Sequence, residues 1–174
     1  MDLLEHQRKV VRTLSTTQVL TGIGTSGTVA AGSLLVTSIT KSESLAGLAQ
    51  TTTVLGAAAM ALPLAKLTQS GGRRLSLMTG YTIGAIGAVL AVLGGTHKIL
   101  FLMLAGALLV GAASASAYQA RFAAIDLATV ENRSRNLSFV VWGSTVGAVT
   151  GPNLMQPAGD FAHYLHLPRL TGPY

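Results

Sequence analysis

The sequence predicts an all-α, polytopic membrane protein, and its composition and charge pattern support that fold class. Only 10% of the 174 residues are charged, against about 25% in typical soluble proteins. Hydrophobic residues make up 49%, and the mean hydropathy is +0.53. A soluble fold with so few charges would leave its surface largely apolar. The charges cluster between long uncharged stretches, a pattern typical of loops that join membrane-spanning helices.

Five uncharged stretches are each long enough to cross a bilayer. A helix needs about 20 mainly apolar residues to span the hydrocarbon layer, whereas a barrel strand needs only about 10 alternating ones. Backbone polar groups in lipid must be satisfied within the segment, so we expect helices. The chain is then one transmembrane domain, residues 1–174, with spans at about 14–39, 45–67, 75–95, 99–122 and 136–157.

The first three expected spans follow one another through short turns. The stretch over 14–39 is too long for the apolar core of a secretory signal, and four further spans follow it. It carries Gln18 and Thr21, which suit a helix that packs in a bundle or lines a cavity. Short loops separate it from the span over 45–67, and that span from the one over 75–95. Sequential helices joined in this way are expected to be antiparallel neighbours.

The last two expected spans, 99–122 and 136–157, are joined by the longest link of the chain. In the fifth span, Gly147 and Gly151 are four residues apart and therefore lie on one helical face. Pro152 follows directly, and proline removes one backbone hydrogen bond and kinks a helix. The pattern predicts a helix that approaches its neighbour closely and can rock against it.

Lys and Arg lie mostly on one side of this topology. Cytoplasmic loops of membrane proteins are enriched in these residues. The N-terminus is therefore expected to be cytoplasmic, and the odd number of spans places Tyr174 outside. The basic residues on the inner side are Arg8, Lys9, Arg12, Lys66, Arg73, Arg74, Arg121, Arg133 and Arg135, against Lys41, Lys98 and Arg169 on the outer side.

Three stretches resemble motifs of the major facilitator superfamily (MFS), in particular of its drug–proton antiporters. Residues 65–74, AKLTQSGGRR, resemble the signature loop between the second and third spans, Gly-x-x-x-Asp-basic-x-Gly-Arg-Arg. Residues 147–152, GAVTGP, resemble the antiporter motif of the fifth span. Residues 119–128, QARFAAIDLA, are similar to a string that closes the fourth span in bacterial members. Together the three stretches lie in the expected gaps and spans.

The resemblance covers nearly the whole chain and implies the N-terminal part of a permease of the bacterial cytoplasmic (inner) membrane. Such a permease would export a small solute by proton antiport. Asp126 is expected either to pair with Arg73 or Arg74, or to belong to a hydrated loop. The candidate residues are Gly72, Arg73 and Arg74 in a gating loop; Gly147, Gly151 and Pro152 in a hinge helix; Arg121 and Asp126 in a charge latch; and Gln18 and Thr21 along the solute path.

Several positions depart from the family pattern. Ala65, Gln69 and Ser70 replace the Gly, the Asp and the following basic residue of the signature loop. Ala107 stands where the family has an Arg within the fourth span, and residues 155–156 are Met-Gln where the antiporter motif closes with a Gly pair. The charge latch and the proton relay are therefore expected to differ from their usual form.

The expected number of spans leaves two functional interpretations open. The superfamily's usual transporter has two six-helix halves around a central path. Five spans make a partial N-terminal bundle in which the sixth helix is missing. The chain is then either a transporter fragment that works with a second half, or a non-transporting remnant or small membrane partner.

Other function classes lack the residues that they need. Cys is absent, which excludes disulfides, thiolate metal sites and Cys nucleophiles, and no Gly-x-Ser-x-Gly elbow occurs. We expect no enzyme, no cofactor and no metal. Basic residues lie between apolar runs and aromatics are only 5%, which argues against nucleic acid. The expected partners are the lipid bilayer, a small-molecule substrate with protons, and a second transporter half.

Overall fold

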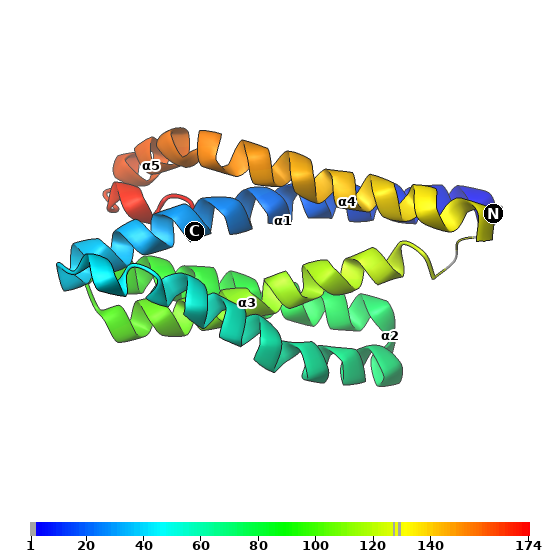
Figure 1. Ribbon diagram of the computed structural model, residues 1–174, viewed down its shortest axis with the longest axis horizontal. Helices are drawn as coiled ribbons and strands as arrows, with labels where there is room; N and C mark the ends of the chain where they lie inside the picture. The colour runs from blue at the N-terminus through cyan, green and yellow to red at the C-terminus, as the bar shows by residue number, and fades with distance from the viewer. Residues whose placement is uncertain (1–2, 127, 129) are drawn as a thin grey trace.

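The computed structural model describes residues 3–126, 128 and 130–174, and these are helical with no strand among them, which confirms the predicted fold class. Figure 1 shows long helices lying side by side along one axis. In chain order the elements are α1 (Leu3–Thr40), a 3-10 turn η1 (Glu43–Leu45), α2 (Leu48–Thr96), α3 (Leu100–Ala123), α4 (Val130–Asn153), α5 (Met155–Tyr164) and a second 3-10 turn η2 (Arg169–Thr171).

Helix α2 reverses direction at Gly72 and so contains two of the expected spans, 45–67 and 75–95. Gly72 has φ 81° and ψ 166°, a conformation that glycine adopts because it lacks a Cβ. Beyond the reversal the two arms lie together, and the Ser76 hydroxyl donates a hydrogen bond to the Leu64 carbonyl at 2.7 Å. The gap between two expected helices is therefore a single-residue reversal (Figure 1).

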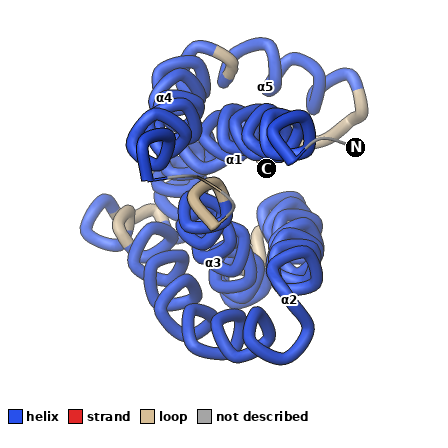
Figure 2. Tube along the Cα trace, turned by 90° about the vertical axis from the view of Figure 1, so that its right-hand side faces the viewer, coloured by secondary structure: helices blue, strands red, loops and turns tan. Residues whose placement is uncertain are grey.

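Two groups of helices make up the molecule, as the view along the helices in Figure 2 shows. Helix α3 packs against both arms of α2. Glycines allow this close approach: a Cβ on Gly84 would lie 2.5 Å from the Ala113 Cβ, and a Cβ on Gly56 would collide with the Leu108 carbonyl. Helix α1 packs against α4 in the second group, and both run in the same direction (Figure 1).

The fifth expected span, 136–157, differs from the helix that is observed. Helix α4 begins earlier, at Val130, and ends at Asn153, and α5 begins at Met155. Pro152 lies in the last turn of α4, where a residue without an N–H cannot continue the hydrogen-bond pattern. The uncharged stretch therefore spans a helix break, because charge alone does not report where a helix ends.

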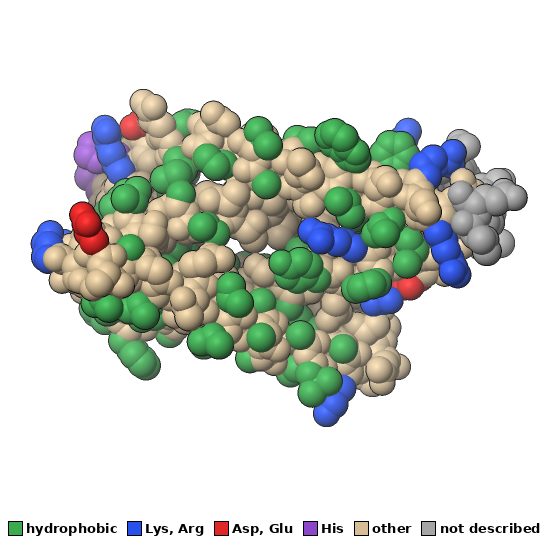
Figure 3. Space-filling view, in the orientation of Figure 1, with side chains coloured by type: hydrophobic (Ala, Val, Ile, Leu, Met, Phe, Trp, Pro, Cys, Tyr) green, Lys and Arg blue, Asp and Glu red, His purple; other side chains and the backbone are tan. Residues whose placement is uncertain are grey.

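The packing is inverted relative to a soluble protein. Small residues fill the interior, and Ala31, Ala107 and Ala112 are fully buried, whereas Phe101 is 84% exposed and Trp142 67%. Large apolar side chains cover the outer surface in Figure 3. Among the described helices, the segments Lys9–Thr40, Glu43–Thr96 and Leu100–Ala123 are long and apolar enough to cross a membrane. A surface of this kind is stable in lipid and unstable in water.

Candidate functional site

A cavity of about 360 Å³ lies where the α1–α4 pair meets the α2–α3 group. All four helices line it, and most of the side chains that line it are polar. In a bundle whose interior is otherwise built from small apolar residues, this is the natural place for a hydrated solute. The polar lining consists of Gln18, Thr21, Thr25 and Thr28 of α1, Gln50 and Thr53 of α2, Ser114, Tyr118 and Arg121 of α3, Ser144 of α4, and Tyr174.

Gln18 and Thr21, the two residues expected along a solute path, both line this cavity. The side chain of Gln18 is 1% exposed, and its amide donates a hydrogen bond to the Ala117 carbonyl on α3 at 2.6 Å. That bond connects the two helix groups across 99 residues of sequence. Leaving this buried amide without its acceptor would lower the stability of the fold by about 1–3 kcal/mol. The bond therefore keeps α1 and α3 in contact at the cavity wall.

Among the described residues, Arg121 has the one charged side chain that lines the cavity. Its guanidinium lies 5.1 Å from the centre of the Tyr118 ring, and one terminal nitrogen is 3.5 Å from the Ser144 hydroxyl. Its Nε is buried without a hydrogen-bond partner among the described residues. In the described part of the chain, no Asp or Glu side chain lines the cavity.

Asp126 pairs with Arg73 rather than with Arg121. The Arg73 guanidinium donates two hydrogen bonds to the Asp126 carboxylate, from Nε at 2.6 Å and from a terminal nitrogen at 3.1 Å. The side chains are 35% and 41% exposed. The two residues expected to form a charge latch are therefore in different surroundings: Asp126 bridges α2 and the end of α3, and Arg121 points into the cavity.

The remaining residues of the expected gating loop have different roles in the structure. Gly72 supplies the reversal between the two arms of α2, and a Cβ placed on it would meet nothing within 4 Å. Its backbone conformation, not a lack of space, therefore calls for glycine. Arg74 is exposed, and no ion pair involves it in the described part of the chain.

The glycines of the expected hinge helix pack against α1. A Cβ on Gly147 would lie 2.8 Å from the Gly22 Cα and 2.9 Å from the Ile23 amide nitrogen. A Cβ on Gly151 would lie 2.6 Å from the Ile23 carbonyl. Pro152, next to them, is exposed and marks the end of α4. The glycine face is thus occupied within this chain.

Gln119 connects both arms of α2 to α3, and sequence reasoning did not single it out. Its side-chain oxygen accepts hydrogen bonds from the Thr68 and Ser76 hydroxyls, each at 3.1 Å. The sequence signal that could have identified Gln119 is a polar amide in an otherwise apolar helix, because a buried amide needs a hydrogen-bond partner. Its partners are 51 and 43 residues away in sequence, so only the fold identifies them.

Comparison with known proteins decides the family. The model of the Major Facilitator Superfamily matches residues 14–156, which include the cavity-lining parts of all four helices. The chain belongs to the major facilitator superfamily. The MFS consists of multi-pass membrane transporters and not of enzymes, which agrees with the expectation from the sequence.

The MFS relatives are longer than this chain. Two uncharacterized MFS-type transporters of Bacillus subtilis (strain 168), YdeG and YddS, are 34% and 33% identical to it over 167 residues. These matches cover 96% of this chain but only 39% and 38% of the relatives. The riboflavin transporter RfnT of Brucella anthropi is 35% identical over 101 residues, which is 58% of this chain and 25% of that protein. No solved structure matches the chain.

Proposed function

We propose that this chain supplies one side of the solute path of an MFS permease that exports a small polar solute in exchange for protons. The observation that carries the proposal is the polar cavity between the two helix groups, with Gln18, Thr21 and Arg121 in its wall. Exchange for protons and the outward direction are supported by the resemblance of residues 147–152 to the antiporter motif.

The Arg73–Asp126 pair is proposed as the charge latch of the inner end. It connects the reversal of α2 at Gly72 to the residues that follow α3 and lead toward α4, so breaking it releases that connecting segment from α2 at the inner end. The latch differs from the family pattern, in which the signature loop supplies its own acid. Here that position is Gln69, and the acid comes from Asp126.

The hinge proposed for α4 rests on its glycines and on the helix break after Pro152. Gly147 and Gly151 remove the side chains that would interlock α4 with α1. A helix with such a smooth contact can rotate against its neighbour without a steric barrier.

The cytoplasmic (inner) membrane of a bacterium is proposed as the location, with the N-terminus inside. The basic residues support this orientation, because nine of the 12 Lys and Arg lie on the proposed inner side. The end at which α1 and α4 begin carries a group of exposed basic side chains in Figure 3.

The alternative of a small partner that docks through exposed glycine faces has less support. The glycine faces of α1, α3 and α4 are filled by other helices of the same chain, as the contacts of Gly22, Gly106 and Gly147 illustrate. The assembled transporter is expected to include further spans, because the chain spans less than two fifths of YdeG and YddS.

Flux measurements in proteoliposomes test the proposal. The chain is reconstituted alone and fused to the C-terminal part of YdeG, and an imposed pH gradient drives labelled small polar solutes, with riboflavin as the first. We expect flux from the fusion only. In the fusion, Gln18→Ala should lower flux about tenfold or more, because it leaves a cavity wall without its hydrogen bond.

Thr51→Ala is the matched control, since Thr51 is exposed on α2 and bonds only within its own helix. It should leave flux unchanged. Flux that is equal in the Gln18→Ala and parent fusions, or that is independent of the pH gradient, would contradict the proposal.

A further inference from the structure

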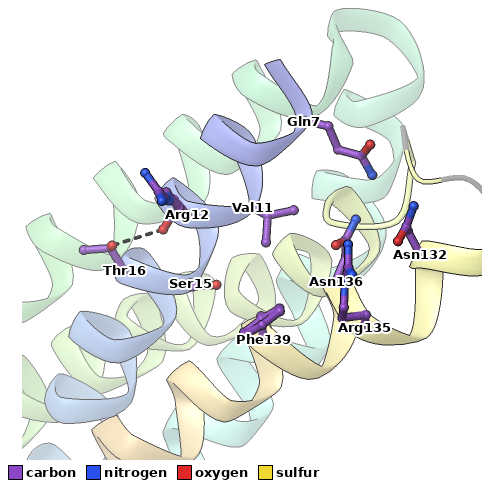
Figure 4. Close-up of a pocket in the computed structure, with 9 residues that line it drawn as sticks. All are labelled: Gln7, Val11, Arg12, Ser15, Thr16, Asn132, Arg135, Asn136 and Phe139. Carbon is purple, nitrogen blue, oxygen red and sulfur yellow. Dashed lines mark hydrogen bonds between the residues drawn. The ribbon is translucent and has the colours of Figure 1, made fainter. Parts of the chain in front are cut away.

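A second and larger cavity, of about 880 Å³, lies between the N-terminal parts of α1 and α4. It is separate from the polar cavity of the proposed solute path, and the two share no lining residue. Figure 4 shows its walls, with Gln7, Arg12 and Ser15 on α1 and Arg135 and Phe139 on α4. The lining residues of the two helices are more than 100 residues apart in sequence, so no sequence motif indicated the cavity.

The described lining of this cavity is rich in hydrogen-bond donors, and no Asp or Glu side chain is among its residues. Arg12 and Arg135 both line it, and neither has an ion-pair partner among the described residues. Both residues are exposed, so their guanidinium groups keep their charge in solvent and can attract an anion that enters the cavity.

Buried polar atoms without partners give a second, independent observation. Gln7 is 9% exposed, and its amide nitrogen has no hydrogen-bond partner in the described structure. Figure 4 shows that side chain extending from α1 toward α4. The Ser15 hydroxyl on the same helix is also buried and unpartnered. Buried donors are nearly always satisfied in proteins, so these two require an acceptor that the described residues do not provide.

The helix backbone also favours an anion in this cavity. Helices α1 and α4 run in the same direction (Figure 1). The cavity is lined by the N-terminal parts of both, and its lining residue Asn132 lies in the first turn of α4. The N-terminal end of a helix carries partial positive charge, which favours an anion. Val11 and Phe139 complete the wall with apolar surface next to these donors. Donors beside apolar surface match a ligand that joins a phosphate to hydrocarbon.

We propose that this cavity binds the phosphate group of an anionic phospholipid. Arg12 and Arg135 hold the phosphate oxygens, Gln7 and Ser15 donate to them, and the acyl chains run along Phe139 toward the exposed apolar surface of α4. A lipid source is favoured over a soluble phosphate because the cavity lies where the uncharged stretches beginning at Thr13 and Asn136 meet the basic ends of their helices, which is the headgroup level of a bilayer.

Trp142 provides a local reporter for the test. It is the only Trp of the chain, is 67% exposed, and follows Phe139 by three residues on α4, so it lies on the same side of that helix. The 174-residue chain is reconstituted in bilayers that contain brominated phosphatidylglycerol or brominated phosphatidylcholine, at about 0.5 M salt to screen the general attraction of surface charges. We expect the anionic lipid to quench Trp142 more strongly.

Two double variants separate a site from a surface effect. R12Q/R135Q removes the two cations of the cavity and should lower the preference for phosphatidylglycerol about tenfold or more. K9Q/R133Q removes the same charge from the same two helices at exposed residues that do not line the cavity, and should keep the preference. Equal loss in both variants would overturn the proposal, since that result indicates a general surface effect.

Two further measurements remove the remaining ambiguities. Glycerol 3-phosphate at millimolar concentration should not relieve the quenching, and relief would overturn the assignment to a lipid in favour of a soluble phosphate. The parent protein in detergent should show a higher melting temperature with added phosphatidylglycerol than with phosphatidylcholine. This measurement does not depend on the folding of any variant, and equal melting temperatures would overturn the proposal.

Discussion

At the scale of single residues, the structure separates charges by what surrounds them. Arg121 lines a cavity in which the described residues include no Asp or Glu, whereas Arg73 donates two hydrogen bonds to Asp126. Both side chains of that pair are more than one third exposed. Exposed pairs contribute about 0–1 kcal/mol to stability. We therefore expect the Arg73–Asp126 pair to matter more for the arrangement of the inner end than for the stability of the fold.

Asp126→Asn is therefore expected to change transport and not folding. The amide cannot replace the two charge-assisted bonds, so the inner end should open more easily. The loss of about 1 kcal/mol of interaction free energy corresponds to a several-fold change in solute flux through the YdeG fusion. Flux in proteoliposomes and the melting temperature of the same preparation are measured together.

Asp160→Asn is the control for that substitution. Asp160 forms a more exposed ion pair with Arg169, at 3.5 Å and at the end of the molecule away from the reversal of α2 (Figure 1). It should leave both flux and melting temperature unchanged. The latch fails as an explanation if Asp126→Asn and Asp160→Asn have the same effect on flux.

At the scale of helices, close packing through glycine determines which elements are neighbours. Lipid offers no hydrophobic force between helices, so contact area between backbones supplies much of the packing energy. Gly22 of α1 meets Gly147 of α4, and Gly106 of α3 meets Ala91 of α2. The first contact lies within the α1–α4 pair and the second within the α2–α3 group. Each contact therefore stabilises one of the two helix groups between which the polar cavity lies.

Gly147→Ala is expected to destabilise the protein by about 1–3 kcal/mol, because its Cβ would lie 2.8 Å from the Gly22 Cα in a backbone contact that cannot give way. Gly24→Ala is the matched substitution on α1, where a Cβ would meet nothing within 4 Å. It should be neutral or stabilising, since Ala favours a helix over Gly by about 1 kcal/mol. Thermal unfolding in detergent, followed by circular dichroism, compares the two. Equal melting temperatures would contradict the packing argument.

At the scale of the whole molecule, the proposed orientation in the membrane rests on the uneven distribution of basic residues between the two ends. Lys66, Arg73 and Arg74 flank the reversal of α2, while Lys98 stands alone between α2 and α3. Moving the more basic end across a membrane would carry more charge through the hydrocarbon layer.

Single cysteines can test this orientation directly, because the chain has none of its own. Ser70→Cys lies at the reversal of α2 and His97→Cys in the turn between α2 and α3, at opposite ends of one helical arm. In intact bacterial cells, a membrane-impermeant maleimide should label His97→Cys and leave Ser70→Cys unlabelled until the cells are lysed. Labelling of Ser70→Cys in intact cells would reverse the proposed orientation.

The sequence by itself determined the class of protein, the helical character of each apolar stretch and the family. These follow from local quantities: the length of an uncharged run, the low charge content and motifs such as GAVTGP over residues 147–152. The end of α4 after Pro152 shows the limit of such reasoning. An uncharged run continues to Gly159, but backbone hydrogen bonding decides where the helix stops.

Only the tertiary structure decided which residues share a site. In the fold, Asp126 pairs with Arg73, and Arg121 lines the polar cavity instead. Gln7 and Arg12 of α1 line a second cavity together with Arg135 of α4. The physical reason is that hydropathy describes how each segment meets lipid, whereas partners across more than 40 residues depend on which helical faces can approach. Small side chains on those faces set that approach, and their effect appears only when two helices are in contact.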